Sequence, residues 1–142
     1  MKLIKFESKY RDDLIFMILE AKNALGRVPG LNEDLLDIQK NYFDKGDMFW
    51  IALDDDDRVI GSVGYSSVEN CDDVVLHRLF VKANLKHQGI GTALLKTLRA
   101  SIKQPVIFRC TSRLAYQRQA RLTIATGINI TSNVATLCRT TI

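Results

Sequence analysis

The feature that most constrains the fold is a strand, a glycine-bearing loop and a helix that follow one another without a break in residues 74–98, VVLHRLFVKANLKHQGIGTALLKTL. The first eight residues are mostly apolar and branched, as in a buried strand, and apolar residues recur at helical spacing after Gly89. Gly89 and Gly91 lack side chains where a ligand must approach the backbone, and amides at a helix N-terminus point outward without partners. The segment predicts a phosphate or pyrophosphate site, with Lys86 and His87 adding positive charge.

Two common phosphate loops do not fit this segment. The Rossmann fingerprint requires a third glycine or alanine where Leu94 stands. The P-loop requires Gly-Lys-Ser/Thr after four intervening residues, which GIGTALLK does not supply. Two glycines alone are also consistent with a tight turn before a helix. The complete strand–loop–helix pattern is what favours a ligand-binding loop.

The remaining hydrophobic pattern predicts α+β layering in a single domain of residues 1–142, with no internal repeat and no low-complexity linker. The expected elements are, in chain order, helices over 10–25 and 32–44, strands over 48–53 and 58–66 joined by an acidic turn at 54–57, a strand over 74–81, a helix over 89–102 and a strand over 106–110. The last two strands are expected to be parallel, because the helix between them makes a right-handed crossover.

Charge is distributed unevenly along the chain. All 16 acidic residues lie at or before Asp73, whereas 11 of the 20 basic residues follow it. A basic second half favours an anionic ligand such as a phosphorylated cofactor or nucleic acid. The basic residues are, however, scattered over predicted strands and helices, without interleaved aromatic residues or a base-reading motif. We therefore do not expect a nucleic-acid partner.

The composition argues against several other classes of protein. Three widely spaced cysteines (Cys71, Cys110 and Cys138) and two histidines do not predict a disulfide framework or a metal centre. No window contains the roughly 18 uninterrupted apolar residues of a membrane helix. The N-terminal segment reaches acidic residues at once and has no apolar signal core. We therefore expect a cytoplasmic protein without a metal or a membrane partner.

Residues 74–98 resemble the acetyl-CoA-binding segment of the GNAT N-acetyltransferases. The loop pattern of that family, Gln/Arg-x-x-Gly-x-Gly/Ala, reads here Lys86-His87-Gln88-Gly89-Ile90-Gly91, and the lysine is a departure that keeps a basic side chain. The order of elements from about residue 10 to residue 110 is also similar. The resemblance implies a three-layer α+β fold with a mostly antiparallel sheet flanked by helices, in which parallel strands over 74–81 and 106–110 splay apart.

The resemblance also implies an activity, a cofactor and a binding site. The activity is acyl-CoA-dependent N-acyl transfer, by direct attack of an amine of a small molecule or a protein on acetyl-CoA in a ternary complex, without a metal. Relatives often dimerise, so a homodimer is compatible with the resemblance. Main-chain groups of Leu79, Phe80 and Val81 would bind the pantetheine arm. The pyrophosphate would be wrapped by Lys86, His87, Gln88, Gly89, Ile90, Gly91 and Thr92.

His77 and Tyr116 are the candidate catalytic residues. Several relatives have a glutamate at the strand position of His77, and an imidazole with a pKa of about 6.5 suits a base that acts directly or through water. Alternatively, His77 only packs or hydrogen-bonds on the strand. Strand alternation places Arg78 on the opposite face, where it pairs with an acid or lines the cofactor channel. Thr123 replaces the usual general-acid tyrosine of the family, and Tyr116 either takes over that role or is an ordinary helix residue.

The tail over 111–142 is atypical. It contains no acidic residue and does not follow the closing pattern of the family. The missing tyrosine and this tail keep a second hypothesis open, in which the chain is a non-catalytic CoA-binding or regulatory module.

Overall fold

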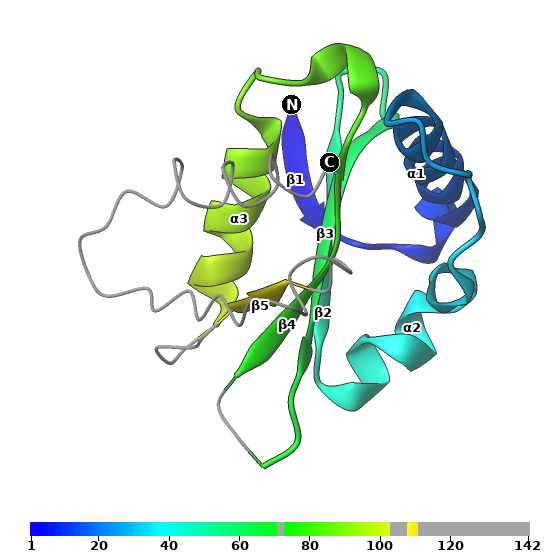
Figure 1. Cartoon of the computed structure of the whole chain (residues 1–142). Helices are drawn as coiled ribbons and strands as arrows, with labels where there is room; N and C mark the ends of the chain where they lie inside the picture. Colours follow the sequence, from blue (N-terminus) through cyan, green and yellow to red (C-terminus); the bar gives the residue numbers. More distant parts are fainter. Residues whose placement is uncertain (71–72, 103–107, 111–142) are drawn as a thin grey trace.

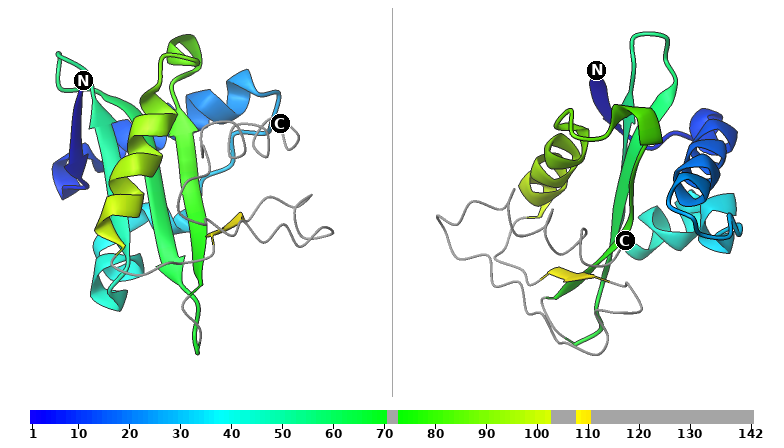
Figure 2. Two further views of the ribbon diagram at one scale, coloured as in Figure 1. Left: turned by 90° about the vertical axis from the view of Figure 1, so that its left-hand side faces the viewer. Right: turned by 45° about the horizontal axis from the view of Figure 1, so that its top comes forward.

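The protein is a three-layer α+β structure, seen in a computed structural model that describes residues 1–70, 73–102 and 108–110. A central sheet separates helices α1 and α2 on one face from helix α3 on the other (Figures 1 and 2). The helices are α1 (Arg11–Ala24), α2 (Ile38–Asn41) and α3 (Ile90–Ser101), and the strands are β1 (Lys2–Lys5), β2 (Met48–Leu53), β3 (Val59–Ser67), β4 (Val74–Val81) and β5 (Phe108–Cys110).

The five described strands lie in the order β1-β2-β3-β4-β5, so that each strand pairs with its neighbour in sequence. The first three pairings are antiparallel, whereas β4 and β5 are parallel, with Val74 opposite Phe108 and Leu76 opposite Cys110. This arrangement confirms the expected α+β class and the parallel pairing across α3. The splaying of β4 from β5 stays a prediction, because the chain after Cys110 is outside the described residues.

Each face of the sheet carries its own hydrophobic cluster. The cluster under α1 and α2 includes Leu14, Ile18 and Phe49, all at most 1% exposed. The cluster under α3 includes Val63, Leu94 and Leu98, all fully buried. Strand alternation supplies both clusters, because successive residues of β2 and β3 point to opposite faces.

Strand β1 is an element that the sequence pattern did not predict. Its four residues, KLIK, pair with β2 so that Leu3 lies opposite Ala52 and Ile4 opposite Ile51. Two apolar residues between lysines are too few to establish a period of two. Exposed lysines at both ends are typical of edge strands, which must avoid pairing with other molecules.

The predicted helix over 32–44 is wrong as a single helix. The chain instead forms a 3-10 helix over Glu33–Leu36, the short helix α2 over Ile38–Asn41 and another 3-10 helix over Phe43–Lys45. Asp37 causes the first break, because its extended φ of −144° ends one segment while its carboxylate accepts a hydrogen bond from the Lys40 amide at 2.9 Å. Aspartate favours such a capping position over a helix interior.

Candidate functional site

The loop before α3 ends in a helix N-terminus with unpaired amides. His87 and Gly89 both have left-handed backbone conformations, with φ of 64° and 82°. This sharp bend starts α3 at Ile90, and the Ala93 amide donates to the Gly89 carbonyl at 2.9 Å. The amides of residues 90–92 precede that hydrogen bond and therefore have no acceptor in the helix. Three N–H groups and the positive end of the helix dipole thus lie together at the place predicted from the glycines.

The space at this N-terminus is open among the described residues. A Cβ on Gly89 would meet no atom within 4 Å, and one on Gly91 would lie 3.7 Å from Cγ2 of Val81. The loop residues 86–89 are exposed, whereas Ile90 is buried and anchors the helix. Neither glycine is therefore required by crowding from the described residues around it. Glycine is favoured at position 89 because φ is positive there. At position 91, the absence of a side chain leaves the amides of residues 90–92 accessible beside β4.

The second half of β4 directs main-chain groups away from β3. The Lys82 amide donates to the Ile60 carbonyl at 2.9 Å, and Phe80 lies opposite Ser62 in the same register. Because antiparallel strands alternate between bonded and non-bonded pairs, the N–H and C=O of Phe80 face β3, and those of Val81 and the C=O of Leu79 face the other edge. The Arg78 carbonyl accepts a hydrogen bond from Ser62 of β3, so the Leu79 N–H, on the opposite side of the same trans peptide group, points away from Ser62. That is the edge on which β5 pairs with the beginning of β4. Cofactor binding by Leu79, Phe80 and Val81 stays a prediction.

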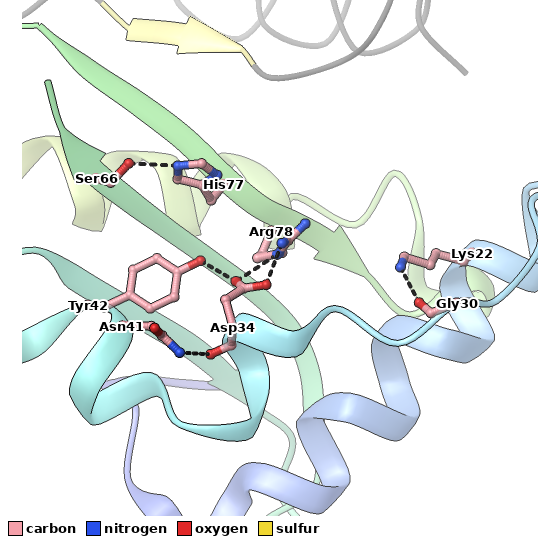
Figure 3. Close-up of polar contacts among 8 residues, drawn as sticks. All are labelled: Lys22, Gly30, Asp34, Asn41, Tyr42, Ser66, His77 and Arg78. Atoms are coloured by element: carbon pink, nitrogen blue, oxygen red, sulfur yellow. Dashed lines mark hydrogen bonds and ion pairs between the residues drawn. The ribbon is translucent and has the colours of Figure 1, made fainter.

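A β-bulge at Arg78 corrects the predicted direction of its side chain. The register shifts between Ser62 and Gly64, so that two residues of β4, Arg78 and Leu79, face the single residue Val63. Arg78 takes a left-handed conformation with a φ of 53°. The extra residue brings the Arg78 side chain to the α2 side of the sheet, where His77 also lies (Figure 3). Strict alternation would have separated the two side chains.

His77 lies in a polar and aromatic environment on this face (Figure 3). Its Nε2 is hydrogen-bonded to the hydroxyl of Ser66 at 2.7 Å, and the ring of Tyr42 meets the imidazole edge-on with centroids 6.3 Å apart. Burial lowers the pKa of His77 below its ordinary value of 6.5, and the Arg78 guanidinium lowers it further, against the opposing carboxylates of Asp34 and Asp47. The imidazole is therefore neutral at pH 7 and able to accept a proton.

Asp34 connects Arg78 to Tyr42 (Figure 3). Arg78 donates from Nε to Oδ2 of Asp34 at 3.0 Å and from Nη2 to Oδ1, and the Tyr42 hydroxyl donates to Oδ2 at 2.6 Å. Burial opposes ionisation of Asp34, but the hydrogen bonds from Arg78 and Tyr42 outweigh it and hold the pKa of this carboxyl below its usual value. Burial and the bond to Asp34 together raise the pKa of Tyr42, so its hydroxyl stays protonated. The predicted pairing of Arg78 with an acid is thus confirmed.

The structure brings most of the predicted residues to two adjoining regions, the α3 N-terminus and β4, which are so close that a Cβ on Gly91 would lie 3.7 Å from Cγ2 of Val81. Tyr116, Thr123 and the tail over 111–142 lie outside the described residues, so the predictions about them stay untested. Sequence reasoning missed Asp34, Tyr42 and Ser66, which are distant in sequence from His77. The contact of Asp34 with Arg78 depends on the bulge, and the positions of Asp34 and Tyr42 depend on the broken helix, neither of which leaves a local pattern. Ser66 reaches His77 across the regular part of the β3–β4 pairing.

Neither a metal site nor a membrane-crossing helix emerges from the part of the chain that the structure describes. Among those residues, no three His, Cys, Asp or Glu side chains gather as metal ligands would. In the same ranges, no helix combines the length and the apolar character that crossing a membrane requires.

Comparison with known proteins gives a family match over most of the chain. Residues 15–121 match the family model described as the acetyltransferase (GNAT) family. The Xenopus tropicalis protein named probable N-acetyltransferase camello is 36% identical over 70 residues, which are 48% of this chain and 32% of that protein. The match therefore spans about a third of the length of that curated relative.

Solved structures show the same fold. An acetyltransferase of the GNAT family from Staphylococcus aureus Mu50 superposes with a TM-score of 0.67 at 23% identity, over 75% of this chain and 71% of that one. A GNAT superfamily phosphinothricin acetyltransferase from Sinorhizobium meliloti, solved in complex with AcCoA, has a TM-score of 0.58 at 19% identity, over 75% of this chain and 64% of that one. At these identities the likeness extends to the fold alone.

Proposed function

This chain belongs to the acetyltransferase (GNAT) family, and from that premise we propose that it is an acyl-CoA-dependent N-acyltransferase with acetyl-CoA as its donor. The proposed reaction transfers the acetyl group to an amine of a small molecule or a protein. The N-terminus of α3 is the observation that carries the proposal, since its three unpaired amides and left-handed entry suit a diphosphate. A solved relative of the same fold contains AcCoA.

In this proposal, acetyl-CoA supplies an activated thioester, and the chain binds and orients it. The amides of residues 90–92 hold the diphosphate, and Lys86 and His87 lie beside it in the loop. The outward main-chain groups of Leu79 and Val81 pair with the pantetheine arm, as an added strand would. A strand N–H near the thioester carbonyl would stabilise negative charge on its oxygen during attack.

The amine attacks the thioester carbon directly, so one C–N bond forms and one C–S bond breaks. The nitrogen loses a proton to a base, and the departing thiolate gains one from an acid or from water. We assign the base to His77, because its imidazole is neutral at pH 7 and is held in place by the hydrogen bond between its Nε2 and the Ser66 hydroxyl. Tyr116 remains the proposed acid.

The second candidate function is a CoA-binding module without turnover. The sequence observation that favours it is Thr123, which occupies the position of the general-acid tyrosine in the family. This alternative uses the same helix N-terminus and the same β4 edge, so it predicts the same affinity for CoA. It differs only in the chemical step.

Calorimetry and a thiol-release assay together test the proposal. We expect CoA to bind the full chain, and pantetheine, which lacks the diphosphate, to bind at least 100-fold more weakly. Free thiol should then be released from acetyl-CoA faster with one member of a panel of primary amines than without it. Absence of CoA binding at millimolar concentration would overturn both candidates. Binding without amine-stimulated release across the panel would favour the non-catalytic module.

A further inference from the structure

The bulge in β4 is held from two sides. Arg78 has a Cβ and yet adopts a left-handed backbone, which residues other than glycine disfavour. Ser62 is fully buried and donates its hydroxyl to the Arg78 carbonyl at 2.7 Å. On the side-chain end, Asp34 accepts two hydrogen bonds from the guanidinium. Because such a conformation persists only where its surroundings enforce it, both contacts act on the backbone at this residue.

Asp34 is itself anchored. Its neighbour Leu35 is 1% exposed and belongs to the core beneath α1 and α2. The Asp34 carbonyl accepts a hydrogen bond from Nδ2 of Asn41 at 3.2 Å, and its carboxylate accepts one from Tyr42. The side chains of Asp34 and Arg78 are only 24% and 27% exposed, so solvent screens their attraction only in part. Asp34 therefore holds the Arg78 side chain against the well-packed segment that runs from the 3-10 helix (Glu33–Leu36) to α2.

The residue after the bulge is the one whose main chain the proposed function needs. Leu79 follows Arg78 directly and directs its N–H and C=O to the edge assigned to the acetyl donor. A rotation at Arg78 would turn the peptide group that leads into Leu79. We infer that the Asp34–Arg78 ion pair positions this edge for the donor, an inference that rests on the proposed function. Asp34 is thus a positioning residue that acts through Arg78.

A purely structural role for the ion pair predicts a different outcome. Loss of the ion pair would then lower the free energy of unfolding, whereas the folded molecules would bind the donor with the same affinity and the same contacts. The chain offers a matched control in Asp13, which accepts a similar two-bond contact from Arg58 at 3.0 and 2.6 Å and one more from the Val59 amide. That pair joins α1 to the start of β3 and involves none of the residues assigned to the donor.

The test is a titration of the ¹⁵N-labelled full chain with CoA, followed through assigned amide resonances. In the wild type, CoA should shift the amides of Leu79 and Val81 as well as those of residues 90–92. In Asp34→Asn, the shifts at Leu79 and Val81 should fall to less than half, and the dissociation constant for CoA should rise threefold or more. The shifts at residues 90–92 should persist. Arg78→Lys, which keeps the charge but loses the two-bond geometry, should behave in the same way.

Asp13→Asn should lower the Tm while keeping every CoA-induced shift and a dissociation constant within twofold of the wild type. If Asp34→Asn does not fold, Tyr42→Phe removes only one hydrogen bond from Asp34 and should give a smaller loss in the same direction. Wild-type shifts at Leu79 and Val81 in the folded Asp34 and Arg78 variants would overturn the inference alone. Absence of any CoA-induced shift in the wild type would overturn the proposed function and, with it, this inference.

Discussion

Gly64 of β3 lies directly opposite His77 of β4, and the missing side chain of Gly64 makes room for the aromatic rings beside the imidazole. A Cβ at this position would lie 2.7 Å from Cδ2 of Phe49 and 3.1 Å from Cε1 of Tyr42. Phe49 and Tyr42 pack edge-on with centroids 5.0 Å apart, and Tyr42 in turn meets His77. The glycine thus sets the position of the ring that contacts the candidate base.

The first prediction concerns this glycine. Gly64→Ala should lower the free energy of unfolding by about 1–3 kcal/mol, because one added methyl group overpacks a core that has no space for it. Urea unfolding followed by Trp50 fluorescence measures the change. Gly30→Ala is the control, since a Cβ there would meet no atom within 4 Å, and its effect should stay below about 1 kcal/mol. Equal stability of the two variants would refute the proposed crowding at Gly64.

Local patterns were sufficient for most of the fold. The strands β2 and β4 begin and end at the predicted residues, and the acidic turn at 54–57 joins β2 to β3 as expected. These elements carry long apolar runs and strong turn residues, so sequence and tertiary packing favour the same conformation. β1 and the segmented helix over 33–45 were missed because their conformation depends on pairing with β2 and on one aspartate cap.

Local patterns predicted the glycine loop of the candidate site but not how the side chains around His77 are arranged. The exposed amides of residues 90–92 follow from the local chain conformation, which one glycine before the helix start and one just after it indicate. That His77 and Arg78 share one face of the sheet could not be predicted, because it depends on one extra residue in β4 relative to β3. A bulge reverses every side-chain direction inferred by alternation beyond it. The contact of Asp34 with Arg78, 44 residues apart, depends in turn on that reversal.

The second prediction is a pH dependence of stability from His77. Burial lowers the pKa of its imidazole in the folded chain below 6.5, so the unfolded chain binds more protons below that pH. The contribution of His77 is complete above about pH 6.5 and is lost as the pH falls toward the folded-state pKa. Between pH 7.5 and pH 5.5, His77→Gln should therefore lose less stability than the wild type. Urea unfolding at both pH values measures the difference.

Carboxyl groups do not obscure this comparison. The lowered pKa values of Asp13 and Asp34 cost stability only as the pH falls below about 5, which lies outside the range compared. Equal losses of stability in the wild type and His77→Gln would contradict a buried, neutral imidazole.

The third prediction separates the chemical role of His77 from its packing. If His77 accepts the proton of the amine, His77→Gln should lower turnover about 100-fold or more while leaving the affinity for acetyl-CoA within about threefold. The acidic limb of kcat/KM in the wild type should lie below pH 6.5, because that limb follows the lowered pKa of the imidazole. Ser66→Ala removes the 2.7 Å hydrogen bond to Nε2. It should shift the apparent pKa of that acidic limb and leave the affinity for acetyl-CoA unchanged. Unchanged turnover in His77→Gln would exclude His77 as the base.

The fourth prediction concerns the α3 N-terminus and uses two substitutions of one residue. Gly91→Ala should keep CoA affinity within about threefold, because its Cβ would only touch Val81 at 3.7 Å. Gly91→Val should lower CoA affinity tenfold or more in calorimetry, since its branched methyl groups would stand beside the amides that must approach the diphosphate. The Tm should change little in either variant, because valine in a helix costs less than about 1 kcal/mol relative to alanine. A folded Gly91→Val variant with wild-type affinity would show that the diphosphate binds elsewhere.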